Sequence, residues 1–406
     1  MIPNTQPPGK NVVSILIVDD SLVFRRFLRE VCGLSPQLHV IGEGRNGIEA
    51  LDLILKLKPD VVLMDMEMPV MDGMTALQHL MIHRPTPLLM FSSLSDEGTA
   101  RAFDALKSGA VDFVCKDFIF REKNLENYKN TILVKLLNCG RMKLGVIDPM
   151  YSAQLISSGE SQVERHIIFC EDCGEKYVLE IENGQLPQQI QCRHCGDVLD
   201  VSAFNKHRRN TFATVIGGGE GCYRSLLAML PMLEIELGGS FLIVVRDAPS
   251  MVDSFAEYLA SVSSFQVFRA SEGQRMEGGH CYVAAAADML VLKPFSAHYT
   301  LQRALPGEET LTEGLDLAMQ SVAKVFKQKS AGVVLSGNEG DGRLGMMAMR
   351  QQGASVFALH SQVCFVDELT QAAQQDGEIV VLEDEQALVE TIRRLHQGAQ
   401  TDSAQV

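Results

Sequence analysis

Short apolar runs that alternate with helical stretches constrain the fold of this chain more than any other sequence feature. In the first third of the chain such runs occur at Val12–Val18, Val61–Met64, Leu88–Phe91 and Val111–Cys115. Stretches with helical periodicity, such as Gly47–Leu57 and Glu97–Lys107, lie between them. This alternation is typical of a parallel sheet with helices on both faces. It therefore predicts an α/β domain of the doubly wound kind.

The alternation stops in the middle of the chain and then resumes. From Phe212 to about Gly398, predicted strands occupy Ala213–Ile216, Phe241–Val245, Met289–Leu292, Gly332–Leu335 and Val356–Leu359. Predicted helices in the same region occupy Met251–Ser263, Glu313–Lys327 and Glu385–Gln397. We therefore expect two doubly wound parallel-sheet domains joined by a small module. The expected boundaries are 1–143 for the first domain, 144–163 for a linker, 164–205 for the small module, 210–398 for the second domain and 399–406 for a polar tail.

Composition excludes several classes of protein. Of the 406 residues, 46% are hydrophobic and 21% are charged, which is typical of a folded globular chain. No apolar stretch approaches the roughly 20 residues that a membrane-spanning helix needs. The polar segment Met1–Lys10 lacks the apolar core of an export signal, so we expect a cytoplasmic protein without membrane insertion. The net charge of −15 argues against a nucleic-acid partner, and it suits a basic protein surface or a metal cation.

Polar residues follow each of the four predicted strands of the first domain. Asp19 and Asp20 follow the first strand, Asp65 the second, Ser92 the third and Lys116 the fourth. Ligand crevices form at the carboxyl ends of such strands. Three carboxylates make an all-oxygen site that suits Mg²⁺, and one of them can attack a phosphoryl group while the lysine offsets its charge. The alternative, a set of solvated strand-end carboxylates, does not account for the whole set of five.

This region resembles the receiver domain of bacterial response regulators, which has a flavodoxin-like fold. The resemblance rests on Val18–Ser21, Met64–Gly73, Ser92–Ser93 and Phe113–Lys116. It implies that Asp65 accepts a phosphoryl group from a histidine kinase, and that Asp20, Asp65 and the carbonyl of Glu67 hold Mg²⁺ beside Asp19. It also implies that Ser92, Phe113 and Lys116 take part in the switch. One departure is Asp117, where the family usually has proline.

Four of the ten cysteines form two C-x-x-C pairs in the small module. Cys170 pairs with Cys173 and Cys192 with Cys195, and 18 residues separate the pairs. This spacing predicts a zinc ribbon, a closed four-thiolate site in which Zn²⁺ is structural and contributes folding energy. A rubredoxin-like iron site and two coincidental thiol pairs remain open. Redox chemistry is disfavoured, because neither pair begins a helix of a βαβ unit. We expect a role in docking a partner or spacing the domains.

Two glycine-rich turns mark the second domain. One, Gly217–Gly221, follows a predicted strand, and the other, Ser336–Gly342, follows the strand Gly332–Leu335. The C-terminal region resembles the catalytic domain of the CheB family of chemotaxis protein-glutamate methylesterases over nearly all of Thr214–Gly377. Receiver followed by this domain is also the order of that family. The resemblance implies hydrolysis of glutamate methyl esters on chemoreceptors, and deamidation of receptor glutamines, through a Ser–His–Asp triad.

Two of the three triad positions are replaced in this chain. The serine position falls on Gly219 and the histidine position on Asp247, whereas the aspartate is present as Asp341. Without nucleophile and base, a triad retains only binding and oxyanion effects. We therefore expect a phosphorylated response regulator whose hydrolase domain is inactive and acts by binding. One alternative is an active esterase or glutaminase with a non-standard nucleophile, for which Cys222 at a helix start is a candidate, although an inert buried thiol is the simpler interpretation. Another is that the zinc ribbon is the output module.

Overall fold

The computed structural model of the chain divides into two compact units, Met1–Ser157 and Ser158–Val406. The boundary between them lies inside the linker predicted at 144–163. The structure describes residues 12–92, 96–116, 125–142, 164–169, 176–181, 189–200, 210–233, 239–263, 266–295, 298–305, 313–338, 340–375 and 379–403. Each unit is considered by itself below. Within the described residues, no helix is both long enough and apolar enough to cross a membrane.

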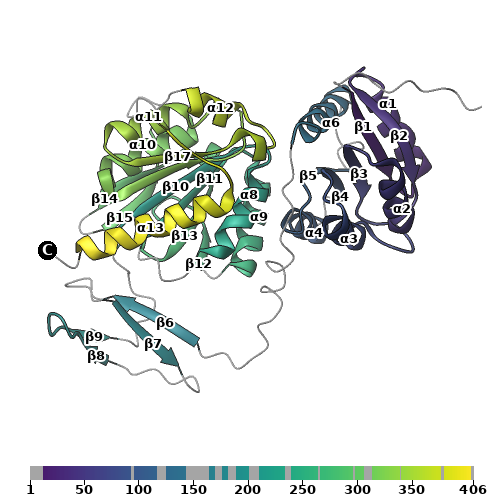
Figure 1. Cartoon of the computed structure of the whole chain (residues 1–406). Coiled ribbons are helices and arrows are strands. Elements are labelled where there is room, and N and C mark those ends of the chain that lie inside the picture. Colours follow the sequence, from purple (N-terminus) through teal and green to yellow (C-terminus); the bar gives the residue numbers. More distant parts are fainter. Residues whose placement is uncertain are drawn as a thin grey trace, which may run out of the picture. The chain divides into compact units, whose positions relative to one another are not determined.

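The first unit is a five-stranded parallel sheet with helices on both faces (Figure 1). Its strands are β1 (Val13–Val18), β2 (Leu38–Gly44), β3 (Val61–Asp65), β4 (Leu88–Ser92) and β5 (Asp112–Cys115). Its helices are α1 (Leu22–Cys32), α2 (Gly47–Leu57), α3 (Gly73–His83), α4 (Asp96–Lys107) and α6 (Leu125–Cys139). The strand order β2-β1-β3-β4-β5 is that of flavodoxin-like folds, with the switch point between β1 and β3. The predicted doubly wound class is confirmed for this unit.

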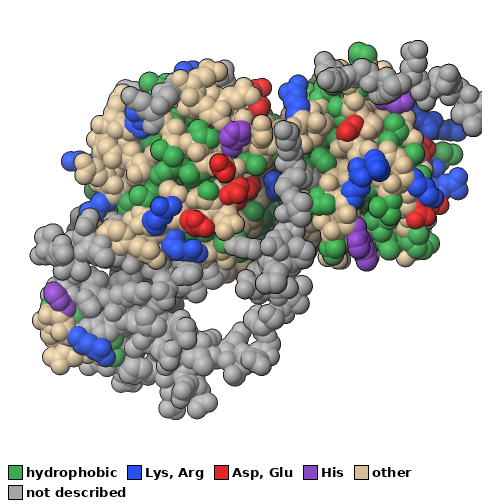
Figure 2. Space-filling model, in the orientation of Figure 1, with side chains coloured by type: hydrophobic (Ala, Val, Ile, Leu, Met, Phe, Trp, Pro, Cys, Tyr) green, Lys and Arg blue, Asp and Glu red, His purple; other side chains and the backbone are tan. Residues whose placement is uncertain are grey.

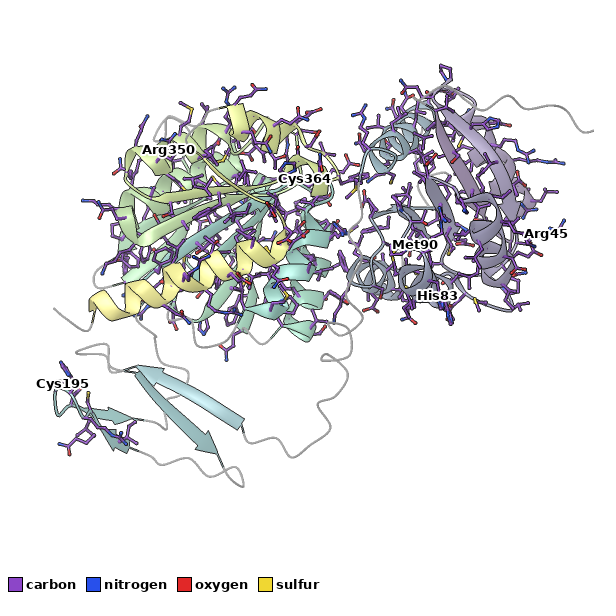
Figure 3. The ribbon with its side chains drawn as sticks, in the orientation of Figure 1. Arg45, His83, Met90, Cys195, Arg350 and Cys364 are labelled. Carbon is purple, nitrogen blue, oxygen red and sulfur yellow. The ribbon has the colours of Figure 1, made fainter. Side chains whose placement is uncertain are left out.

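Strand ends and helix starts meet at one edge of this sheet. Central strands β3 and β4 are buried along their whole length, so their sequences are nearly continuous apolar runs. Helix α1 begins where the Ser21 side chain accepts a hydrogen bond from the Phe24 amide, and α3 begins where Asp72 accepts one from the Thr75 amide. These caps place the start of each helix close to the strand that precedes it. The polar residues of these connections therefore lie at the edge of the sheet formed by the carboxyl ends of its strands. Met90 lies in the interior of this unit and Arg45 at its surface (Figure 3).

The second unit contains a seven-stranded parallel sheet in the order β12-β13-β11-β10-β16-β17-β18. The strands are β10 (Ala213–Gly218), β11 (Ser240–Val245), β12 (Gln266–Arg269), β13 (His280–Ala285), β16 (Ser330–Val334), β17 (Ser355–Leu359) and β18 (Val380–Leu382). The helices are α8 (Cys222–Met229), α9 (Pro249–Val262), α10 (Gly314–Phe326), α11 (Arg343–Gln351), α12 (Glu368–Gln375) and α13 (Glu385–Ser403). The second predicted doubly wound domain is therefore confirmed, with β10 at the centre of its sheet.

The structure adds to or differs from the expectations for this unit in three details. The run Met289–Leu292 does not join the parallel sheet, because β14 (Leu290–Phe295) pairs with β15 (His298–Arg303) in a separate antiparallel hairpin. Strand β13 was not predicted, since His280, Cys281 and its alanines make a weak apolar run. The polar tail predicted at 399–406 is helical as far as Ser403, because α13 continues past Gln397 and the single Gly398 does not end it.

Two short antiparallel hairpins lie in the region of the predicted small module. One pairs β6 (Glu164–Phe169) with β7 (Lys176–Ile181), and the other pairs β8 (Gln189–Gln191) with β9 (Val198–Asp200). Each C-x-x-C pair falls in the connection of one hairpin. Cys170 and Cys173 lie outside the described residues, whereas Cys192 and Cys195 lie within them.

Candidate functional site

The acidic residues that follow β1 and β3 come together at the carboxyl edge of the first sheet. Asp19 and Asp65 are buried and Asp20 is exposed, and one ligand oxygen from each lies within 4.8 Å of the others. Lys116, which follows β5, places its Nζ 2.8 Å from Asp19 Oδ2 and 2.7 Å from Asp65 Oδ1. The structure thus brings together four residues, of which the first and the last lie nearly a hundred positions apart in the chain.

Burial and charge set the protonation of this group. Desolvation raises the pKa of Asp65 to about 6; the Lys116 ammonium and the Glu67 backbone amide lower it, while the charge of Asp19 raises it. One ammonium offsets one of the three carboxylates, so a divalent cation would balance the other two. The donors are all oxygen, which is the set that Mg²⁺ prefers. The carboxylates of Asp19, Asp20 and Asp65 therefore fit a Mg²⁺ site.

The loop after β3 is shaped by one glycine. The Gly73 amide donates to the Met66 carbonyl at 3.0 Å, which brings the start of α3 against the end of β3. A Cβ atom at Gly73 would lie 2.1 Å from the carbonyl oxygen of Asp65, so only glycine allows this approach. The Glu67 side chain is exposed, and its Oε1 lies 3.5 Å from Arg101 of α4. The position of Glu67 thus leaves its backbone, and not its carboxylate, for the site.

The residues assigned to the switch lie on the last two strands of the same sheet. Ser92 ends β4 and is buried. The ring of Phe113 on β5 meets that of Phe103 on α4 edge to face, with 6.0 Å between the ring centroids. Lys116 Nζ also lies 4.7 Å from the centre of the Phe24 ring. Of the three residues assigned to the switch, Lys116 contacts the acidic group directly.

The glycine-rich turns of the second unit lie next to each other. The Gly219 amide donates to the Ser336 carbonyl at 2.9 Å, and the Ser336 hydroxyl donates to the Glu220 carbonyl at 2.6 Å. A Cβ atom at Gly219 would have its nearest neighbours 3.7 Å away, at Arg246 Cβ and Gly337 Cα, which is ordinary van der Waals distance. Gly219 also avoids the left-handed region that Gly221 occupies. The backbone therefore leaves room for a side chain where the resemblance expects serine.

Asp247 occupies the histidine position and has partners of its own. Its Oδ2 accepts a hydrogen bond from the Tyr223 hydroxyl at 3.0 Å, and its Oδ1 accepts one from the Ala248 amide at 2.7 Å. The residue is exposed at the start of α9, whereas Tyr223 is buried on α8. Asp247 therefore links the starts of two helices and replaces imidazole with a group that only accepts hydrogen bonds when ionised.

Asp341 is held as a helix cap. Its two carboxylate oxygens accept hydrogen bonds from the amides of Leu315 and Asp316, both at 2.9 Å, in the first turn of α10. Asp316 reciprocates, because its Oδ1 accepts from the amides of Gly342 at 2.9 Å and Gly345 at 2.6 Å, at the start of α11. Burial raises the pKa of Asp341 to about 6 and also raises the pKa of Asp316. The pair therefore ties two helix N-termini together.

The structure also locates Cys222, the candidate non-standard nucleophile, and two histidines of the second unit, His280 and His360. Cys222, the first residue of α8, has 0% of its surface exposed. His360 follows β17, and its Nδ1 accepts a hydrogen bond from the Gln362 amide. His280 does not follow a strand but begins β13, so it lies at the opposite edge of the parallel sheet from the turns.

The second cysteine pair has the backbone of a tight turn. The Cys192 amide donates to the Asp197 carbonyl at 2.6 Å, and the Gly196 amide donates to the Cys192 carbonyl at 3.0 Å. Gly196 has a φ of 82°, a conformation that glycine adopts without strain. Cys192 is buried, while Cys195 is exposed at the tip of the hairpin (Figure 3). This turn is compatible with two thiolates that face one ion.

Two residues beside these sites were not identified from the sequence. Tyr223 follows Cys222 in an ordinary helical stretch and gives no separate signal. Arg25 on α1 does give a sequence signal. It lies three positions before Leu28 and seven before Cys32, so the three residues share the buried face of the helix. A charged residue on an apolar face indicates a buried ionic contact.

Comparisons with known proteins agree on two regions. The family model described as CheB methylesterase matches residues 214–391, and that of the response regulator receiver domain matches residues 15–127. Protein-glutamate methylesterase/protein-glutamine glutaminase 2 of Photobacterium profundum is 30% identical over 374 residues, which cover 90% of this chain and 94% of the relative. The protein of the same name from Pseudomonas fluorescens is 31% identical over 356 residues, which cover 87% of this chain and 91% of the relative.

Solved structures from Thermotoga maritima resemble each unit in turn. The CheB methylesterase catalytic domain is 23% identical and covers 46% of this chain and 97% of its own, with a TM-score of 0.41. The response regulator domain of CheB is 35% identical and covers 33% of this chain and 99% of its own, with a TM-score of 0.31.

Proposed function

The chain belongs to the CheB-type response regulators, which join a receiver domain to a methylesterase domain, and from this premise we propose that its output is binding controlled by phosphorylation. The phosphoryl donor is a chemotaxis-type histidine kinase, and the bound partner is a chemoreceptor or another protein of the pathway. We expect both encounters in the cytoplasm. The relatives are named as methylesterases and glutaminases; hydrolysis is not proposed for this chain.

Asp65 is the proposed phosphoacceptor. Its carboxylate oxygen would attack the phosphorus of the donor, and the donor nitrogen would leave with the bonding electrons. Bound Mg²⁺, held by Asp20, Asp65 and the Glu67 carbonyl, would neutralise charge on the transferring oxygens. Lys116 lies 2.7 Å from the nucleophile, close enough for its ammonium to pair with the phosphoryl group. The buried hydroxyl of Ser92 would then bond the new group and report it to α4.

The absence of a nucleophile at Gly219 is the observation that carries the proposal for the second unit. Gly219 offers only hydrogen to a substrate carbonyl, and Asp247 is engaged by Tyr223. Asp341 has a structural partner for each oxygen, so its presence does not require a catalytic role. Cys222 supports the alternative of an active enzyme less well, because its buried thiol does not reach an ester on a large protein substrate.

A binding role also suits the surface of this unit. On the face of this unit that Figure 2 shows, several acidic side chains lie next to one another, and basic side chains lie beside them. Nucleic-acid binders concentrate Lys and Arg on one face. A mixed surface of this kind is compatible with a protein partner.

The decisive experiment measures methanol release from methylated chemoreceptor by the phosphorylated full-length protein. We expect release at the rate of the receptor alone, while the Photobacterium profundum relative in the same assay shows that the substrate is competent. A double variant, Gly219→Ser with Asp247→His, tests whether the missing groups alone account for the loss, since position 219 has room for a side chain. Release by the unaltered protein at the rate of the relative contradicts the proposal. Loss of that release in Cys222→Ala would then establish the alternative.

We also propose that Cys170, Cys173, Cys192 and Cys195 bind one structural Zn²⁺. The support is the spacing of the two pairs, the two hairpins that carry them, and the turn at Gly196. The module would serve to dock a partner or to space the two larger domains.

A further inference from the structure

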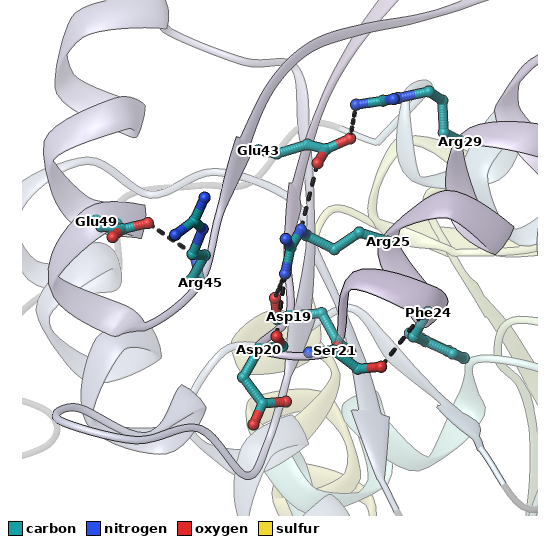
Figure 4. A network of polar contacts seen from close by, with 9 residues as sticks. All are labelled: Asp19, Asp20, Ser21, Phe24, Arg25, Arg29, Glu43, Arg45 and Glu49. Carbon is teal, nitrogen blue, oxygen red and sulfur yellow. Dashed lines mark hydrogen bonds and ion pairs between the residues drawn. The ribbon is translucent and has the colours of Figure 1, made fainter.

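A buried arginine lies behind the acidic residues of the first unit (Figure 4). Arg25 on α1 is only 5% exposed. One of its terminal nitrogens donates to the carbonyl oxygen of Asp19 at 2.6 Å and to that of Asp20 at 3.1 Å. The guanidinium therefore contacts the backbone of both residues, on the side away from their carboxylates.

The arginine is itself fixed by the neighbouring strand. Its Nε lies 3.2 Å from Oε2 of Glu43 on β2, and Arg29, one helical turn further along α1, pairs with the other oxygen of Glu43. The planar guanidinium thus has a carboxylate on one edge and two carbonyls on the other, an arrangement that a lysine cannot reproduce. Because the guanidinium is held by Glu43, it restricts the movement of the Asp19 and Asp20 carbonyls to which it donates.

Other contacts leave little freedom to the same short segment. The Asp19 amide donates to the Gly44 carbonyl at 3.2 Å, and the Ser21 amide donates to Asp19 Oδ1 at 2.8 Å. Arg25 supplies what these bonds do not, since it restrains the carbonyl of Asp20. Asp20 is the exposed member of the acidic group and lacks the burial that restrains Asp19 and Asp65.

We propose that Arg25 is a positioning residue for the divalent cation of this site, and that Glu43 holds it in place. This inference rests on the proposed function, because it concerns the Mg²⁺ that assists phosphorylation of Asp65. Arg25 touches neither the cation nor the phosphoryl group. It fixes the backbone between β1 and α1 so that the carboxylates of Asp19 and Asp20 converge with Asp65 before the ion binds.

Charge and positioning predict opposite effects, and this makes the proposal testable. A guanidinium close to three carboxylates repels an incoming cation, so by charge alone its removal would tighten metal binding. By positioning, its removal weakens binding, because partners that orient ligating carboxylates typically contribute tenfold to a hundredfold in metal affinity. The sign of the change in affinity therefore separates the two.

The experiment titrates zinc-replete full-length protein with Mn²⁺, a probe that also prefers oxygen ligands, and counts free Mn²⁺ by its EPR signal. We expect about tenfold weaker binding in Arg25→Met and in Arg25→Lys, which keeps the charge but loses the fork, and a smaller loss in Glu43→Gln. Arg26→Met is the matched control, because Arg26 is the next residue, is exposed and carries the same charge. Its affinity should stay within twofold of the unaltered protein.

A merely structural role gives a different result. The melting temperature of each zinc-replete variant is also measured without Mn²⁺. A merely structural role would lower the melting temperature while leaving the Mn²⁺ affinity unchanged. Affinity that is unchanged or tighter in the folded Arg25→Lys and Glu43→Gln variants overturns the proposal, even if Arg25→Met does not fold. Failure of the proposed function appears elsewhere, as labelling that persists in Asp65→Asn, and leaves the Mn²⁺ result intact.

Discussion

Asp65 and Gly219 show how differently single residues serve the two units. Asp65 keeps a nucleophilic oxygen beside a lysine at the end of β3, whereas Gly219 has an open backbone position and no side chain at all. Both positions were chosen through the family resemblance, which depends on the residue present at each of them. The sequence could not show that Asp341 caps α10, since the Leu315 and Asp316 amides that it accepts from lie 26 and 25 positions away. Nor did it identify Arg25, whose acceptors are the backbone carbonyls of Asp19 and Asp20 and the carboxylate of Glu43.

Replacement of Asp65 by asparagine should abolish phosphorylation. The amide of Asp65→Asn has no nucleophilic oxygen, so acetyl phosphate with Mg²⁺ should leave no stable label on the protein. The measurement is mass spectrometry of intact protein after incubation. Asp52→Asn, an exposed carboxylate on α2, is the control and should be labelled like the unaltered chain. Full labelling of Asp65→Asn would place the phosphoacceptor elsewhere.

Among the elements, strands with continuous apolar runs were predictable, and strands with short or interrupted runs were not. Strands β3, β10 and β11 are buried throughout and appear in the sequence as apolar runs. Strand β12 alternates between exposed and half-buried residues and β18 is short, so neither has a continuous run. The hairpin β14–β15 was taken for a parallel strand because a buried apolar run has the same appearance in both settings. Helix positions followed well from periodicity, as α2 at Gly47–Leu57 illustrates.

The reciprocal caps of α10 and α11 predict a cost for removing Asp341. In Asp341→Ala two buried amides of α10 lose their acceptor, while the burial of a carboxylate is relieved. The net change expected is a loss of about 1–2 kcal/mol in the free energy of unfolding at pH 7, measured by chemical denaturation. Asp247→Ala removes an exposed carboxylate and should change stability by less than about 0.5 kcal/mol. Equal effects of the two substitutions would contradict the structural role of Asp341.

Helix α13 is attached to the sheet by a histidine that resists protonation. His396 Nε2 lies 2.8 Å from the Thr214 hydroxyl, the rings of Phe212 and Phe241 flank it, and burial lowers its pKa to about 3. The unfolded chain takes up this proton below about pH 6.5 and the folded chain does not, so stability falls as the pH falls from 6.5 towards 3.

The expected loss from this group is about 2 kcal/mol between pH 7 and pH 5, and calorimetric melting at both values measures it. His396→Phe should lose that part of the pH dependence. Because the raised pKa values of Asp65 and Asp341 act in the opposite direction, the comparison is between variant and unaltered protein at each pH. His83→Phe, at an exposed position on α3, is the control and should keep the full dependence. An unchanged slope in His396→Phe would rule out this histidine as its source.

At the scale of the whole molecule, the chain combines two doubly wound units with a cysteine-bearing region between their sheets in sequence. The order of the units was predictable because each has its own alternating pattern and its own glycine-rich or acidic strand ends. The first cysteine pair and the linker 144–163 lie outside the described residues. The prediction of a zinc site in this region therefore rests on the spacing of its cysteines and on the turn at Gly196.

Zinc content tests this middle region. Purified protein should contain about one zinc per chain by elemental analysis, and Cys170→Ser or Cys192→Ser should lower it, because a four-thiolate site tolerates no missing ligand. Cys32→Ala removes a thiol from α1 of the first unit and should leave the metal content unchanged. Protein that is free of zinc and iron, yet fully protected from hydrogen exchange in β8 and β9, would exclude a metal there. Iron in place of zinc would indicate the rubredoxin-like alternative.

The mutual capping of α10 and α11 has a consequence for how such chains are sorted from genomes. Selection for a stable scaffold is enough to preserve Asp341, whether or not any ester is ever cleaved. A method that takes the presence of this aspartate as evidence of catalysis will assign hydrolase activity to family members that lack the serine and the histidine. Position 219, where the backbone leaves room for a side chain, and position 247, which is exposed, are the better positions for diagnosis.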